Sequence, residues 1–192
     1  MDFSKKTKRF LGALVLLAFF ILWIYIIYKI PATEIVDFVG INNGYVLIFV
    51  LAFIGGTSIL FPLPYYLAVF TFAGGGLNPF LLAIFAGTGV AVGDSTSYFI
   101  GYNGREILSE KLQKIFDRFH QWSMKKPKWI FFSFLYLYPT VSPLPNDIII
   151  LPLGLARFPY FKLIIPMWLG DITFNLIVAL SGIYGFSYLG IT

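Results

Sequence analysis

The sequence predicts an all-α polytopic membrane protein. Hydrophobic residues occupy 58% of the 192 positions, charged residues occupy only 12%, and the mean hydropathy is +0.82. This balance is far more apolar than a soluble domain of the same length needs. The apolar residues also fall into stretches long enough for an α-helix to cross the hydrocarbon core of a bilayer, which takes about 20 residues.

The remaining residue types restrict the chemistry. The chain has no cysteine and one histidine, so disulfides and thiolate nucleophiles are excluded and a site built on several imidazoles is not expected. The net charge of +5 is explained by topology, because Lys and Arg accumulate on the cytoplasmic side of membrane proteins. Without a basic groove that carries interleaved aromatic residues, nucleic-acid binding is not expected. We therefore expect no enzyme, no metal and no cofactor.

Residues 1–43 are expected to form an N-terminal transmembrane helix and an external connection. Four basic residues within the first nine positions precede an apolar stretch at 10–28. That stretch is too long for a signal peptide and has no small-residue cleavage site, so it is expected to be a retained span. The basic N-terminus then lies in the cytoplasm.

Residues 44–192 are expected to form a single membrane domain. Its predicted elements are a re-entrant helical hairpin at 44–78, a transmembrane helix at 79–103, an amphipathic helix at 104–128, a second re-entrant hairpin at 129–158 and a transmembrane helix at 159–188. If each hairpin returns to the side from which it entered, every Lys and Arg except Lys29 lies on the cytoplasmic side. The apolar stretch after Pro64 is also too short for a second full span.

The charged segment 104–128 has the periodicity of an amphipathic helix. Apolar residues recur at spacings of three and four, at Leu108, Leu112, Ile115, Phe119 and Trp122. The pattern is typical of a helix in the cytoplasmic membrane interface, with basic side chains near anionic headgroups. A helix packed on the protein's own surface has the same pattern, so both interpretations stay open.

The two halves of the domain repeat one order of motifs. Each half begins with a Pro-Leu-Pro sequence, at residue 62 and again at residue 143. An apolar half-helix, a turn with proline and a span containing Gly-Asp then follow in the same order. One hairpin is entered from outside and the other from the cytoplasm, so the repeats are expected to be inverted, as in many transporters. Proline is favoured at the first helical position, so Pro64 and Pro145 are expected to begin half-helices whose N-termini suit anions. Prolines that only kink ordinary helices are the alternative.

Asp147 lies within an apolar region, where a carboxylate is costly and is by default a functional candidate. It follows Asn146 directly after the second Pro-Leu-Pro. Two roles remain open for it. It either caps the half-helix or binds a proton or cation as substrate moves.

Asp94 and Asp171 are the other two aspartates in apolar regions. Each has a polar neighbour one helical turn away, Tyr98 and Asn175, so each is expected to be either a coupling site or a carboxylate held by that neighbour. Asp94 also lies beside a row of small residues spaced four apart, which lets another helix approach closely. The row consists of Gly89, Gly93, Ser97 and Gly101.

Together these features resemble the DedA family of the VTT-domain superfamily, also called SNARE-associated Golgi proteins. The resemblance covers residues 55–185 and rests on the paired hairpins, on Gly93-Asp94 with Tyr98, Gly101 and Gly104, and on SPLPNDIIILPLGLARFPYF at 142–161. It implies a plasma-membrane lipid transporter, since bacterial members are linked to recycling undecaprenyl phosphate and eukaryotic relatives to phospholipid scrambling. Proton-dependent members carry an acid in the first hairpin and arginines in the second, and both are missing here at 58–66 and 136–147.

The leading expectation is a flippase or scramblase for a lipid with an anionic head, such as a polyprenyl-phosphate carrier or a phospholipid. The helix N-termini would replace the water that the headgroup loses. The expected substrate path consists of Pro62, Pro64, Pro143, Pro145, Asn146, Asp147, Arg157 and Lys162. A proton- or sodium-coupled transporter of a small solute or ion is the alternative. A hydrolase is not expected, because the histidine lies in the charged segment and no base is available to activate a nucleophile. A structural scaffold and self-association stay open.

Overall fold

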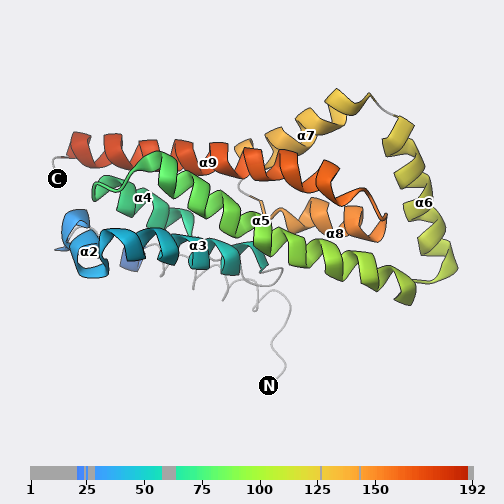
Figure 1. Cartoon of the computed structure of the whole chain (residues 1–192), viewed down its shortest axis with the longest axis horizontal. Helices are drawn as coiled ribbons and strands as arrows, with labels where there is room; N and C mark the ends of the chain where they lie inside the picture. Colours follow the sequence, from blue (N-terminus) through green and yellow to red (C-terminus); the bar gives the residue numbers. More distant parts are fainter. Residues whose placement is uncertain are drawn as a thin grey trace, which may run out of the picture.

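The computed structural model describes residues 21–23, 25, 29–57, 64–125, 127–142 and 144–189, and this part of the chain is helical, without strands. Two long helices, α5 (Pro79–Gly104) and α9 (Tyr160–Leu189), pack against each other and run along most of the molecule (Figure 1). Both are long and apolar enough to cross a membrane. A bent pair of shorter helices makes a third candidate span within the described residues if it is counted as one. The apolar helices indicate an integral membrane protein.

The N-terminal region differs from its prediction. The predicted span at 10–28 lies largely outside the described residues. The predicted connection at 29–43 is not a loop, because α2 (Ala32–Val39) occupies most of it and α3 (Ile41–Thr57) follows after a bend of 94°. Ala32 and Val36, one turn apart, are buried against the rest of the domain, which stabilises a helix in a segment that the sequence pattern left undefined. Gly40 makes the bend at φ 82°, a conformation that glycine adopts without strain.

Each predicted hairpin region contains two helices. The first consists of α3 and α4 (Tyr66–Gly74), and the second of α7 (Lys128–Val141) and α8 (Asp147–Leu155). In each half the first helix packs on the long helix that follows it, so α3 lies along α5 and α7 lies along α9. The second helix packs on the long helix of the other half, so α4 lies along α9 and α8 along α5. The two halves are therefore interlocked in an equivalent way.

Close helix contacts repeat at matching positions. A Cβ at Gly101 on α5 would lie 2.6 Å from the carbonyl oxygen of Leu151 on α8, and Gly182 on α9 meets the carbonyl oxygen of Phe70 on α4 in the same way. Within each half, Gly93 contacts the backbone of α3 at Phe53, Gly56 and Thr57, and Gly170 contacts α7 at Tyr136, Pro139 and Thr140. In both cases the three contacted residues are spaced i, i+3 and i+4, so α3 and α7 pack through equivalent faces. Gly89 also packs closely on α3, and Ser97 is fully buried.

The turns after α4 and α8 share one conformation. Gly76 and Arg157 both have positive φ, 98° and 52°. In each turn an N–H closes back on the last helical turn, from Leu77 to Phe72 O at 3.0 Å and from Phe158 to Leu153 O at 2.9 Å. These bonds satisfy carbonyls that a helix end leaves open. The repeat in the sequence is thus matched by local structure.

Tyr98 links the second of these turns to α5. Its hydroxyl donates to Phe158 O at 2.6 Å in a buried position. The expectation that Tyr98 holds Asp94 is therefore wrong, because its hydroxyl bonds a backbone acceptor that has no other partner among the described residues.

Replacing Tyr98 with phenylalanine is expected to lower the free energy of unfolding by about 1–3 kcal/mol, since a buried carbonyl loses its donor. Thermal unfolding of the detergent-purified protein measures this. Tyr184→Phe is the control, because that ring is 71% exposed. Equal melting temperatures for both variants and the parent would contradict the role assigned to the bond.

The charged segment forms a short 3₁₀ turn, Arg105–Ile107, and α6 (Glu110–Lys125), which lies at the opposite end of the molecule from α2 (Figure 1). It starts later than the predicted residue 104 because α5 continues through Gly104. Arg105 anchors it by donating to Leu155 O at 2.9 Å and to Asp117 Oδ1 at 2.6 Å. Four of its apolar side chains, Leu112, Ile115, Phe119 and Trp122, are 38–52% exposed, whereas Leu108 and Phe116 are half-buried.

Candidate functional site

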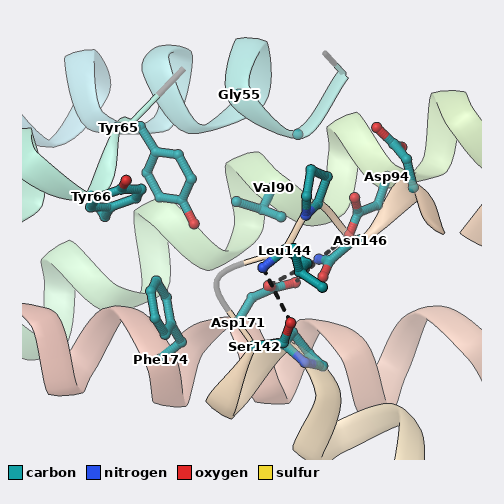
Figure 2. A pocket seen from close by; sticks show the side chains of 14 residues that line it. Gly55, Tyr65, Tyr66, Val90, Asp94, Ser142, Leu144, Asn146, Asp171 and Phe174 are labelled. Carbon is teal, nitrogen blue, oxygen red and sulfur yellow. Dashed lines mark hydrogen bonds between the residues drawn. The ribbon is translucent and has the colours of Figure 1, made fainter. Parts of the chain in front are cut away.

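A cavity of about 90 Å³ lies where the N-termini of α4 and α8 meet the long helices α5 and α9 (Figure 2). Its lining residues are Gly55, Gly56, Tyr65, Tyr66, Val90, Asp94, Pro139, Ser142, Leu144, Pro145, Asn146, Asp147, Asp171 and Phe174. A cavity of this size holds several water molecules, since one needs about 10–15 Å³ by a comparable measure. It brings together polar groups from both halves of the chain among apolar helices.

Asn146, at the N-terminus of α8, bridges two buried aspartates. Its Nδ2 donates to Asp94 Oδ2 at 2.8 Å and to Asp171 Oδ1 and Oδ2 at 3.1 and 3.3 Å. An amide nitrogen carries two hydrogens, so this bridge uses both of them. Asp94 and Asp171 are 1% and 4% exposed. One neutral side chain thus holds the carboxylates of α5 and α9 near each other.

Asp171 therefore has a different partner from the predicted one. The Nδ2 of Asn175 donates to the backbone carbonyl of Asp171 at 2.8 Å, and not to its carboxylate. A residue four positions later on a helix is well placed to reach the backbone carbonyl of the first residue. The carboxylate is left free to face the cavity and Asn146.

Asp147 lies beside the bridge on the first turn of α8 and is 7% exposed. Its Oδ1 is buried and has no hydrogen-bond partner among the described residues, and the same is true of Asp94 Oδ1. The N-cap residue of α8 is Asn146, whose side chain makes no capping hydrogen bond, and Asp147 follows it in the first turn. The capping role considered for Asp147 stays a prediction. Two of the acids that line the cavity therefore each have a buried carboxylate oxygen without a donor among the described residues.

Aromatic rings form the other side of the cavity. Figure 2 shows Tyr65, Tyr66 and Phe174 together, opposite Asp94, Asn146 and Asp171. The rings of Tyr65 and Tyr66 are 6.0 Å apart, and those of Tyr66 and Phe174 are 6.5 Å apart with an edge-to-face tilt of 83°. The Tyr65 hydroxyl accepts a long hydrogen bond of 3.4 Å from Asn175 Nδ2.

The prolines lie before the helices and do not begin them. The N-caps of α4 and α8 are Tyr65 and Asn146, so Pro64 and Pro145 precede them by one residue. Their carbonyls accept from Leu67 N at 3.1 Å and Ile148 N at 3.3 Å, which makes each proline the start of a turn that continues into the helix. Pro145 lines the cavity, whereas Pro64 does not. Pro62 and Pro143 lie outside the described residues.

The two basic residues of the predicted path are not at this cavity. Arg157 lies at the far end of α8, where it pairs with Glu106 Oε1 at 3.3 Å and stacks 4.9 Å over the ring of Tyr102. Lys162 is exposed on the first turn of α9. Because Arg157 and Asp147 lie at opposite ends of one helix, the fold separates residues that the sequence placed on one path.

Sequence reasoning missed the aromatic residues of the cavity. Tyr65 and Tyr66 follow Pro64 as Asn146 and Asp147 follow Pro145, so comparing the two repeats position by position could have found them. Phe174 has no comparable signal. It was one aromatic residue among many in an apolar span.

The cavity's charge is one-sided. Three aspartates line it, and none of its lining residues is Lys or Arg. The described residues contain no group of three or more His, Cys, Asp or Glu side chains placed to hold a metal ion. Such a site is suited to binding protons or cationic groups.

Fold and cavity define an all-helical integral membrane protein with a polar, acidic site among apolar helices. No family model matches the chain, and no curated protein or solved structure matches it either.

Proposed function

We propose that this protein is a membrane lipid transporter, a flippase or scramblase of the DedA/VTT type, in the plasma membrane with its N-terminus in the cytoplasm. In this proposal the regions 44–78 and 129–158 are re-entrant hairpins and the two halves are inverted repeats. The observation that carries the proposal is the polar cavity formed where two half-helix N-termini meet the acids of two long apolar helices.

The cost of moving a lipid headgroup across a bilayer is mainly the loss of its hydration. A cavity with carboxylates, an amide and tyrosine hydroxyls supplies polar contacts in place of water. Because α4 packs on α9 and α8 packs on α5, the cavity lies between the two halves of the chain. Transporter sites commonly lie at the interface between inverted repeats, so this position supports the proposed inverted repeat. The exposed apolar side chains of α6 favour its placement in the cytoplasmic interface.

The lining bears on the type of lipid. A phospholipid and a polyprenyl phosphate both carry a phosphate, but the N-terminus of α8 already holds Asp147 in its first turn. That carboxylate disfavours a second anion there. The N-terminus of α4, which carries Tyr65 and Tyr66, is the better place for a phosphate.

The proposed function is tested by lipid movement in proteoliposomes. Fluorescent polyprenyl phosphate and fluorescent phospholipids are compared, with and without a proton gradient, by quenching the outer leaflet chemically. We expect phospholipids to move much faster than in protein-free vesicles. Glu110→Gln, an exposed change on α6, is expected to move lipids as the parent does and is the matched control for the aspartate variant described next. If no lipid moves faster than in empty vesicles, lipid transport is excluded.

A proton- or sodium-coupled transporter of a small solute is a second candidate, favoured by the shared contact of Asp94 and Asp171 with Asn146. Two buried carboxylates around one neutral amide are a natural place for one positive charge. This candidate requires a proton or sodium flux that depends on substrate. Lipid movement without such a flux would exclude the coupled transporter. Lipid movement that Asp147→Asn leaves unchanged at every pH would exclude the titrating role of Asp147.

A further inference from the structure

Three features of the described residues meet at the cavity: carboxylates without a cationic partner, buried oxygens without a donor, and a group of aromatic rings. Among the described residues, the two ion pairs that the structure shows, Arg105–Asp117 and Arg157–Glu106, both lie away from the cavity. The amide of Asn146 gives Asp94 and Asp171 hydrogen bonds but no charge. A positive ligand would let these carboxylates ionise in an apolar surrounding.

Two carboxylate oxygens of the cavity's acids lack a donor. Asp94 and Asp147 line the cavity, and the Oδ1 of each is buried without a hydrogen-bond partner among the described residues. Buried polar atoms without a partner are rare in native structures and call for one. Both are acceptors when ionised, so the missing group is a donor or a cation.

The aromatic side narrows the type of cation. Tyr65, Tyr66 and Phe174 lie across the cavity from Asp94 and Asp171 (Figure 2). Aromatic faces attract organic ammonium groups, and cages of such rings are a known way to bind them. The described residues offer no group of three or more His, Cys, Asp or Glu side chains placed to hold a metal ion.

We propose that the cavity binds an ammonium group, with the carboxylates of Asp94, Asp147 and Asp171 on one side of it and the rings of Tyr65, Tyr66 and Phe174 on the other. The group belongs either to the headgroup of an amine-bearing phospholipid or to a soluble amine. The first source rests on the proposed lipid transport and specifies its substrate class as ethanolamine or choline lipids. The phosphate of such a lipid would lie toward the N-terminus of α4.

The charge preference of the cavity is measured with a single cysteine. The chain has none of its own, and Leu144 lines the cavity with 56% of its surface exposed. In Leu144→Cys, the cationic trimethylammonium-ethyl methanethiosulfonate is compared with the anionic sulfonato-ethyl reagent, both corrected for their rates with a free thiol. We expect the cationic reagent to react faster by about 10-fold or more, as acidic clefts concentrate cations.

Background variants assign the effect to the named acids. Asp147→Asn and Asp171→Asn, each combined with Leu144→Cys, are expected to reduce the rate ratio by about 3-fold or more, because each removes one charge that focuses the cation. Glu110→Gln in the same background is expected to leave it unchanged. A ratio near that of the free thiol, or one that the aspartate variants do not alter, would overturn the proposal.

Protection experiments identify the source of the group. Millimolar choline is expected to slow the cationic modification, while equal sodium and inorganic phosphate are not. In vesicles of fixed phosphatidylglycerol content, with the remainder either phosphatidylethanolamine or an uncharged glycolipid, slowing with phosphatidylethanolamine indicates a lipid headgroup, whereas slowing by choline alone indicates a soluble amine. Sodium as effective as choline would overturn the ammonium site. Choline protection without any lipid movement would keep the site and reject lipid transport.

Discussion

Replacing Asn146 with leucine is expected to reduce transport by at least about 10-fold and to lower the free energy of unfolding by about 3 kcal/mol or more, because two buried carboxylates lose their shared donor. Leucine has a similar size and no polar atoms. The carboxylates of Asp94 and Asp171 would then lie near each other without the amide that separates them. Proteoliposome transport and thermal unfolding in detergent measure the two effects.

Two further variants make this prediction specific. Asn103→Leu is the matched control, since Asn103 is exposed near the end of α5 and the same change should have little effect there. Asn146→Asp keeps the shape but replaces the donor with a third acceptor, so it should lose transport at neutral pH and regain part of it at low pH, where carboxyls are protonated. Full activity of Asn146→Leu would show that the bridge has no functional role.

Gly93→Ala is the second change with a large expected effect, a loss of about 2 kcal/mol or more in unfolding free energy, because the added methyl has no space. A Cβ there would lie 2.7 Å from the carbonyl carbon of Gly56 and 2.8 Å from Phe53 O. Both neighbours are backbone atoms of α3, so no side chain can rotate away. The helices would have to separate next to Asp94, and transport should fall as well.

The control for this variant uses the same substitution. Gly104→Ala adds a methyl where nothing lies within 4 Å, at a helical position with φ −64°, and should be neutral or stabilising by up to about 1 kcal/mol. Thermal unfolding of both proteins in one detergent gives the comparison. A Gly93→Ala protein as stable as Gly104→Ala would mean that α3 and α5 do not depend on this close approach.

Much of the secondary structure could be predicted because it depends on short-range patterns. The long spans were predicted at 79–103 and 159–188, and α5 and α9 occupy nearly the same residues. The small-residue row on α5 likewise indicated close packing, which Gly93 and Gly101 show against α3 and α8. By contrast, α2 was missed, since a helix of eight residues is too short to be stable on its own and depends on burial of Ala32 and Val36.

The partners of the buried acids were the least predictable part of the site. Local spacing favoured Tyr98 and Asn175, each four residues from an aspartate, but the Tyr98 hydroxyl bonds Phe158 O and the Asn175 amide bonds a backbone carbonyl. The donor to both carboxylates is Asn146, which is separated from Asp94 by 52 residues and from Asp171 by 25. Sequence spacing identifies neighbours on one helix, whereas this bridge joins the three helices α5, α8 and α9.

By itself, the sequence determined that this is an apolar, helical membrane protein with a repeated unit and three aspartates in apolar surroundings, because hydropathy and helical period are local properties. Only the tertiary structure decided that Tyr65, Tyr66 and Phe174 line one cavity with those aspartates, and that Arg157 and Lys162 do not. The reason is the exchanged packing of the half-helices: α4 crosses to α9 and α8 to α5. That arrangement depends on contacts between residues far apart in the chain, which no local pattern encodes.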